Sequence, residues 1–229
     1  MTEGDRHRLR EVDLVLFKTK HAFDLLSKET KAAALVGFTT VDRRDASVRR
    51  IPRTALHVAG WNPHKGTAAI LASWSARPDW PEIRVVTQLK GLTGECRNVR
   101  VFNTRITDRA LRSLQNECTV HVCPSEVEGF GHTLVEAMSC GAVTVTTAAP
   151  PMNEVITPEE GFLVPYSRTE PMGAGTRYLV DADSLADVMN RVWTLDSGTF
   201  EQLSKAARAR FERMQSSFHD SLVTALSGI

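Results

Sequence analysis

Several features that would place this sequence in a special class are missing from it. The four cysteines form no CxxC pair (Cys96, Cys118, Cys123 and Cys140), which argues against a zinc module or a disulfide framework. No apolar run approaches the roughly 20 residues of a membrane-spanning helix, and the charged N-terminus is unlike a signal peptide. The net charge is only +1, from 28 basic and 27 acidic side chains, so no broad nucleic-acid binding is expected. We therefore expect a cytoplasmic enzyme or binding domain.

The order of apolar runs predicts the fold class. From Pro52 onward, short apolar runs alternate with helical patterns, which is typical of βαβ units around a parallel sheet. Strands are expected at residues 55–60, 83–88, 99–103, 119–124, 142–147 and 161–165. Helices are expected at 67–74, after an N-cap at Thr107, at 132–140, at 184–195, and once or twice more towards the C-terminus. The prediction is an α/β fold with a Rossmann-like parallel sheet flanked by helices.

A smaller unit precedes this regular part. Residues 12–17 and 33–38 read as strands and residues 20–29 as a helix, which together make a partial N-terminal βαβ appendage. Residues 39–53 are polar, rich in arginine and without periodicity, as in an exposed connection. With 229 residues, the chain is long enough for one domain plus a piece of another. We place the boundary between residues 1–50 and residues 51–229.

The segment 124–145, PSEVEGFGHTLVEAMSCGAVTV, carries the strongest chemical signal. Gly129 and Gly131 let the backbone approach a ligand closely, and the free N–H groups of a helix that begins near His132 can hold a phosphate or a sugar hydroxyl. Glu128 lies in the loop and Glu136 in the second helical turn. Carboxylates accept hydrogen bonds from vicinal hydroxyls, so the two can serve opposite ends of an elongated nucleoside diphosphate sugar.

Four pieces of the sequence then fall in an order that we recognise. The run E-G-F-G-x-x-x-x-E-A-M-x-x-G resembles the E-x7-E motif of retaining glycosyltransferases with the GT-B fold, family GT4. AGWNPHKG resembles the G-R-x-x-x-x-K-G loop of that family, and CPS resembles its V-x-P-S. PPMNEVI followed by EEGFLVP resembles its G-G-x-x-E followed by G-x-L-V. The similarity covers roughly residues 56–195 well and residues 12–38 weakly.

The resemblance implies a hexosyltransferase that uses a UDP- or GDP-sugar, retains the anomeric configuration, and needs neither a metal nor another cofactor. It implies that Lys65 neutralises the donor diphosphate, that Glu128 is catalytic at the anomeric carbon, and that Glu136 binds the ribose. Backbone contacts to the donor sugar and phosphates would come from Gly129, Phe130, Gly131 and His132. Position alone, after two predicted strands, places Gln88, Arg105 and Ile106 near the base. Whether Glu128 acts as an electrostatic stabiliser or as a nucleophile stays open.

Two departures from the family pattern leave several interpretations open. The arginine expected five residues before Lys65 is Gly60, and Arg53, Arg97 or Arg105 are candidates to replace it. Most of the acceptor-side domain has no counterpart, and neither has its catalytic histidine. The chain is then a minimal transferase completed by a second copy, a nucleotide-sugar-binding subunit that needs a partner chain, or an interaction domain without donor binding. The acceptor is not predicted.

Other chemistry-bearing residues receive structural interpretations. His57, on a predicted strand, is expected to be a core histidine with both ring nitrogens satisfied. The pair Asp181 and Asp183 resembles a metal-binding DxD, but Asp183 precedes an apolar-periodic helix and is expected to be its N-cap. The basic stretch 43–53 and the helix with Lys205, Arg208, Arg210 and Arg213 are expected to be solvated. This is favoured over a peripheral membrane contact.

Overall fold

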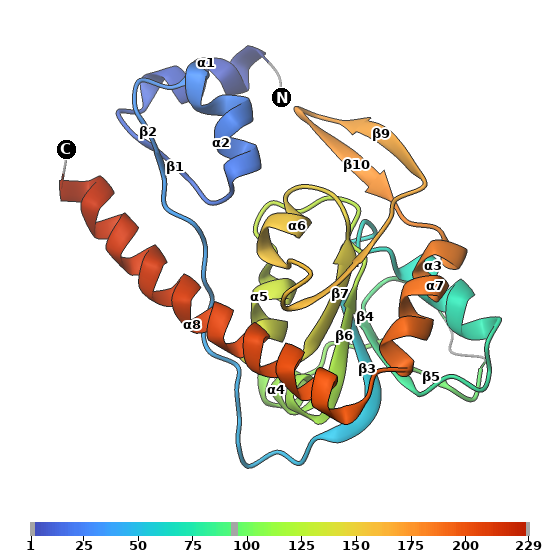
Figure 1. Ribbon diagram of the computed structural model, residues 1–229. Helices are drawn as coiled ribbons and strands as arrows, with labels where there is room; N and C mark the ends of the chain where they lie inside the picture. Colours follow the sequence, from blue (N-terminus) through green and yellow to red (C-terminus); the bar gives the residue numbers. More distant parts are fainter. Residues whose placement is uncertain (1–2, 93–95, 228–229) are drawn as a thin grey trace.

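A six-stranded parallel sheet forms the centre of the computed structural model, which describes residues 3–92 and 96–227 (Figure 1). The strand order is β5-β4-β3-β6-β7-β8. The strands are β3 (Ile51–Gly60), β4 (Ile83–Thr87), β5 (Val99–Phe102), β6 (Cys118–Cys123), β7 (Val143–Thr147) and β8 (Gly161–Val164). All six predicted strands are confirmed, and β3 begins earlier than predicted, within the stretch that was expected to be an exposed connection. The α/β fold class is confirmed.

Helices cover both faces of the sheet because successive strand residues point to opposite sides. On one face, α3 (Thr67–Ser75) and α7 (Ala182–Trp193) pack on a core that includes Ile70, Val85 and Leu185. On the other face lie α4 (Asp108–Glu117), α5 (His132–Ser139), α6 (Met152–Val155) and the first half of α8 (Ser197–Ser227). Thr107 is the N-cap of α4, as predicted: its Oγ1 accepts from the Ala110 N–H at 3.2 Å.

The direction of chain progress through the sheet reverses between β3 and β6. From β3 the chain moves outward through β4 to β5, and from β6 it moves outward the other way through β7 to β8. The loops that leave β3 and β6 therefore start side by side at the carboxyl edge and lead to helices on opposite faces of the sheet. In open parallel sheets, ligands bind at this switch point.

The N-terminal unit is a βαβ appendage, as predicted. It contains α1 (Glu3–Glu11), β1 (Val15–Phe17), α2 (Lys20–Leu26), the short 3-10 helix η1 (Ser27–Glu29) and β2 (Ala33–Leu35). β1 and β2 pair in parallel, and both are shorter than predicted. Helix α1 was not predicted, because Leu9 is the one large apolar residue among its nine and no apolar face results.

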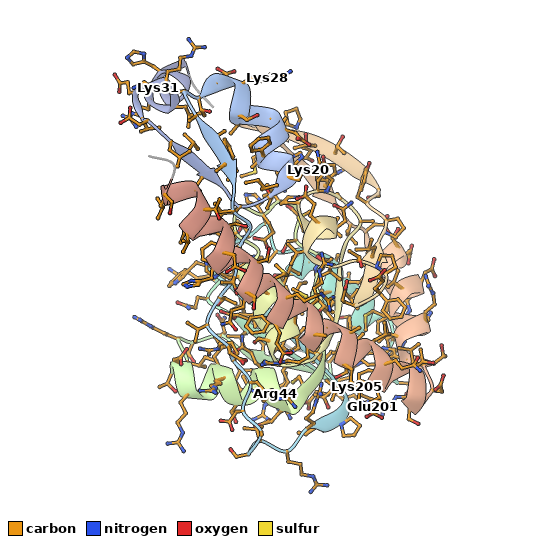
Figure 2. The ribbon with its side chains drawn as sticks, turned by 60° about the vertical axis from the view of Figure 1, so that its left-hand side comes forward. Lys20, Lys28, Lys31, Arg44, Glu201 and Lys205 are labelled. Atoms are coloured by element: carbon orange, nitrogen blue, oxygen red, sulfur yellow. The ribbon has the colours of Figure 1, made fainter. Side chains whose placement is uncertain are left out.

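Residues 39–50 connect the two parts, and they are not simply solvated. The Arg43 guanidinium donates to Gln115 Oε1 at 2.9 Å and to Asp108 Oδ1 at 2.8 Å, and its side chain is only 12% exposed. Arg208 on α8 forms a bidentate ion pair with Asp42, at 2.7 and 2.8 Å. Arg210 on α8 is only 25% exposed and donates to the Glu154 and Val155 carbonyls. The expectation of solvated basic faces is therefore wrong at Arg43, Arg208 and Arg210. It holds at Lys205, which pairs with Glu201 on the exposed side of α8 (Figure 2).

The N-terminal cap of α7 (Ala182–Trp193) differs from the prediction. The N-cap of α7 is Asp181, whose Oδ1 accepts from the Ser184 N–H at 2.7 Å, whereas the Asp183 side chain is 96% exposed. Within the described residues, no group of three His, Cys, Asp or Glu side chains is arranged as ligands of one metal ion.

An unpredicted antiparallel hairpin, β9 (Arg168–Met172) and β10 (Gly175–Leu179), follows β8. No described helix, α8 of 31 residues included, is apolar over a length that would cross a membrane.

Candidate functional site

Two loops meet at the switch point, and each ends in a glycine that begins a helix. Gly66 is the N-cap of α3 with φ +71°, and Gly131 is the N-cap of α5 with φ +66°. Neither supplies a side-chain cap, so the first N–H groups of both helices are open to an anion. A Cβ at Gly66 would lie 2.2 Å from the carbonyl oxygen of Pro124, which begins the other loop. The two loops therefore touch, and glycine is required for that approach.

Lys65 and Glu128 form an ion pair across these loops. Lys65 directly precedes Gly66, and its Nζ donates to Glu128 Oε1. The side chains are only 13% and 8% exposed, so water screens the pair weakly. The structure thus brings together the cation and the carboxylate for which separate roles were predicted. It does so at the carboxyl edge, between two helix N-termini.

Glu136 has a different partner on a different element. It lies on α5, and its Oε2 accepts from Gln115 Nε2 of α4 at 2.7 Å. The Arg43 Nε–H in turn donates to Gln115 Oε1. Sequence reasoning missed this support, because no local pattern marks Gln115, a polar residue of α4 that is buried in the structure. Glu136 Oε1 has no hydrogen-bond partner among the described residues.

The side chains of Phe130 and His132 contact the appendage. Their rings stack at 5.5 Å with an angle of 18°, and Phe38 meets both rings edge-on, at 5.8 and 4.9 Å between centroids. Lys18 Nζ lies 3.3 Å from the centroid of the Phe130 ring. The sequence predicted backbone contacts at Phe130 and His132, and it held no signal for Lys18 or Phe38. The motif loop is therefore held from the N-terminal side as well.

A cavity lies at the carboxyl ends of β4 and β5. Gln88 and Arg105, two of the three predicted base-binding residues, line about 790 Å³ there together with Trp61, Lys90, Asn103 and Thr104. Ile106 instead lines a neighbouring cavity beside α4, so the structure does not group it with the other two. Trp61 was missed, and its indole is 71% exposed. An exposed indole beside polar groups is suited to stacking on a flat ring.

The comparisons with known proteins show the family and the fold of this chain. The family described as Glycosyl transferases group 1 matches residues 47–208, which is more than half of the chain. The chain belongs to this family. A serotype-specific mannosyltransferase of Escherichia coli, WbdA, is 31% identical over 97 residues, which is 42% of this chain and 12% of WbdA.

Solved structures of glycosyltransferases share the fold. Sucrose-phosphate synthase of Thermosynechococcus elongatus superposes with a TM-score of 0.67 at 19% identity, over 98% of this chain and 61% of that one. Anabaena HepE, solved with UDP-glucose, gives 0.72 at 16% identity, over 100% of this chain and 69% of that one. The chain thus spans a small part of the curated relative and about two thirds of these solved chains.

The family arginine that is absent at Gly60 has one remaining candidate substitute among the three considered. Arg53 donates to the Trp193 carbonyl at 2.6 Å, and Arg97 donates to the Pro78 carbonyl at 3.1 Å. These two arginines lie at the amino ends of β3 and β5, which is the edge opposite the site. Arg105 alone follows the carboxyl end of a strand and lines the cavity there.

The hairpin β9–β10 is tied to both family loops through Glu126. Arg177 Nη2 donates to Glu126 Oε2 at 2.6 Å, and the Tyr178 N–H donates to the Glu126 carbonyl at 2.8 Å. The Glu126 N–H donates to the His64 carbonyl at 2.9 Å. Glu126 therefore joins the hairpin, the loop after β3 and the loop after β6.

His57 is a buried core histidine with a hydrogen-bond partner at each ring nitrogen, as expected. Its Nδ1 lies 2.8 Å from the Val122 carbonyl, which only accepts, so Nδ1 carries the proton. Nε2 then accepts from the Thr67 hydroxyl at 2.9 Å. Burial lowers the pKa of His57 to about 4, so the ring is neutral near pH 7. Through the hydrogen bond to Thr67, the ring supports the first residue of α3.

Proposed function

We propose that this chain is the donor-binding and catalytic part of a glycosyltransferase that uses a nucleotide diphosphate sugar. Residues 51–229 form the donor domain, and residues 1–50 contribute a piece of the acceptor side. The observation that carries the proposal is the Lys65–Glu128 pair between two helix N-termini that begin with glycine. HepE was solved with UDP-glucose and WbdA is a mannosyltransferase, which makes UDP-glucose and GDP-mannose the first donors to test.

The mechanism follows from where charge develops. As the bond to the sugar breaks, negative charge grows on the departing diphosphate, and Lys65 with the N–H groups after Gly131 would stabilise it. Glu128 would face the sugar as it becomes oxocarbenium-like. The acceptor hydroxyl would form the new bond to the anomeric carbon and pass its proton to a leaving phosphate oxygen. Retention of configuration and independence of metal ions are part of the proposal, on the strength of the family motif.

At the other end of the donor, Glu136 and the cavity of Trp61 would hold the nucleoside. Glu136 Oε1 is available to ribose hydroxyls while Gln115 fixes Oε2. The Trp61 indole would stack on the base, with Gln88 and Arg105 at its edge. Hydrogen bonds to the base edge would then decide which nucleotide is accepted.

A second candidate function is a nucleotide-sugar-binding subunit that needs a partner chain or a second copy for its acceptor site. The appendage favours it, because its two strands have only three residues each. Leu16 and Leu35 on the strands and Leu25 on α2 are exposed. Two-stranded sheets of this size gain stability from further packing. Donor binding without any transfer, restored by a second polypeptide, would select this candidate.

Calorimetry with UDP-glucose, GDP-mannose and ADP-glucose tests the proposal. Glu136→Ala is expected to weaken the free nucleotide and its sugar about tenfold alike. Glu128→Gln is expected to weaken only the part of the affinity that depends on the sugar, and Glu159→Ala, at an exposed carboxylate, serves as the control. Folded protein that binds none of the three donors would refute the proposal. Equal loss of UDP and UDP-glucose in Glu128→Gln would refute the assigned role.

A turnover assay tests the two finer parts of the proposal. NMR of the product shows whether the anomeric configuration matches that of the donor, and an inverted product would contradict retention. Transfer rates with and without EDTA are expected to agree. A rate that collapses on chelation and returns with added metal would contradict metal independence.

A further inference from the structure

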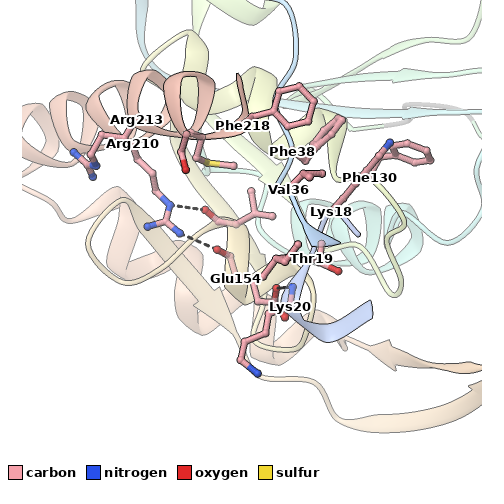
Figure 3. A pocket seen from close by; sticks show the side chains of 15 residues that line it. Lys18, Thr19, Lys20, Val36, Phe38, Phe130, Glu154, Arg210, Arg213 and Phe218 are labelled. Atoms are coloured by element: carbon pink, nitrogen blue, oxygen red, sulfur yellow. Dashed lines mark hydrogen bonds between the residues drawn. The ribbon is translucent and has the colours of Figure 1, made fainter. Parts of the chain in front are cut away.

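An apolar cavity lies between the appendage, α6 and α8, against the family motif loop. It has a volume of about 380 Å³, within the range of small-molecule sites. Its apolar walls come from all these elements and are formed by Val36, Phe38, Phe130, Val155, Met214 and Phe218 (Figure 3). Phe130 stands between Glu128 and Gly131, so a ligand in this cavity touches the loop assigned to the donor. Nothing in the proposed donor site uses this space.

Most charges around the cavity already have partners. The Glu154 carboxylate accepts from the backbone N–H groups of Lys20 and His21, each at 2.8 Å, and so caps α2. The Lys20 ammonium pairs with Asp24. Arg210 donates to two backbone carbonyls of α6, at 2.8 and 3.0 Å (Figure 3). Glu154 and Arg210 therefore hold elements together, and Lys20 is paired within α2.

Lys18 is different, because its ammonium has no carboxylate partner among the described residues. Nζ lies 3.3 Å from the centroid of Phe130 and 5.1 Å from that of Phe38. Lys18 is partly buried, and this burial lowers the pKa of its ammonium. Contact with an aromatic face replaces only part of what water or an anion would supply. The cavity thus combines apolar walls with the ammonium of Lys18, which lacks an anion. Arg213, exposed on α8, is a second lining cation without a carboxylate partner among the described residues.

We propose that this cavity binds the acceptor substrate, and that the acceptor is an amphiphile whose anionic group pairs with Lys18 while its apolar part packs between the appendage and α8. This inference rests on the proposed function and adds the chemical class of the acceptor. The shared wall at Phe130 places the anionic end of the acceptor beside the sugar to be transferred. Acceptor and donor must then bind together.

Calorimetry of the full chain with octyl phosphate, octyl glucoside and inorganic phosphate tests both halves of the ligand. Octyl phosphate is expected to bind at one site per chain, and the other two are expected to bind at least about tenfold more weakly. Lys18→Met keeps the stem and removes the charge, and it is expected to weaken octyl phosphate about tenfold. Lys20→Met is the matched control, because that ammonium is already paired. Equal losses in both variants would overturn the role of Lys18.

A second pair of variants tests the location without disturbing the core. Ser217 is exposed on α8 and lines the cavity, whereas its neighbour Ser216 is exposed and does not line it. Ser217→Trp is expected to fill the cavity and abolish octyl phosphate binding, while Ser216→Trp leaves it unchanged. Binding that survives Ser217→Trp would overturn the assigned site.

Octyl phosphate binding measured with and without UDP distinguishes a failure of this inference from a failure of the proposed function. Saturating UDP is expected to leave the affinity for octyl phosphate within about twofold, because the two sites are adjacent and distinct. Competition between the two would overturn the inference, since it would mean that the probe occupies the donor site. Donor binding with no octyl phosphate binding overturns the inference alone. Octyl phosphate binding without any donor binding overturns the acceptor assignment together with the proposed function.

Discussion

Removing one member of the Lys65–Glu128 pair should cost more stability than removing both. Lys65→Met leaves the Glu128 carboxylate, 8% exposed in the native protein, without its cation. An uncompensated buried charge costs about 3 kcal/mol, and Glu128→Gln leaves the Lys65 ammonium in a similar position. The double variant Lys65→Met/Glu128→Gln buries no charge there, and its loss should be only about 1 kcal/mol.

Urea unfolding at pH 7, followed by circular dichroism, measures these differences. For a chain of 229 residues, a loss of about 3 kcal/mol corresponds to a melting temperature lower by roughly 6–12 °C. The decisive quantity is the coupling in the double-mutant cycle, because the single losses would sum to about 6 kcal/mol if the sites were independent. Additive losses, or single variants as stable as the wild type, would refute the pairing of these side chains in the free protein.

Two further predictions concern the support of the site. Gly66→Ala should lower the free energy of unfolding by about 3 kcal/mol, because its Cβ would lie 2.2 Å from the Pro124 carbonyl oxygen. Gly60→Ala, also at positive φ but in open space, should lower it by only about 1–2 kcal/mol. Equal losses in urea unfolding would contradict this difference. Burial lowers the pKa of His57 and of His121 to about 4. The unfolded chain therefore binds protons first as the pH falls. Each neutral ring therefore adds about 3 kcal/mol to the free energy of unfolding above pH 6.5, and this contribution is lost progressively as the pH falls from 6.5 to 4. Replacing either histidine with glutamine should remove about half of this pH dependence, as measured by urea unfolding between pH 6.5 and 4. An unchanged pH dependence would contradict the lowered pKa of that histidine.

The central sheet was predictable because its signal is local. Buried parallel strands are continuous apolar runs, and IRVVT and CTVHVC are visible as such without knowledge of their neighbours. The helix starts at Thr107 and His132 were also readable from capping residues and glycine. Asp181 was missed as the N-cap of α7 because Asp183 stands two residues later and is an equally good capping residue by type.

The hairpin and the supporting network were not predictable, because their causes lie elsewhere in the chain. The strand sequences RTEPM and GTRYL have no alternation of apolar and polar residues, and the hairpin is held by Arg177 to a carboxylate 51 positions away. Gln115 joins Arg43 to Glu136, which are 93 positions apart, through hydrogen bonds that no local pattern encodes. The motif predicted the residue types of the site, and the fold supplied their partners.

The capping of α2 by Glu154 has a consequence for the order of folding. The helix is synthesised before its capping carboxylate, which follows 134 residues later, and the α8 residues beside that carboxylate follow later still. A two-stranded sheet and a seven-residue helix are marginal by themselves. Contacts of such long sequence separation form slowly. The appendage is therefore expected to dock last, onto a sheet that has already folded, so the acceptor-side wall would be completed only after the donor side exists.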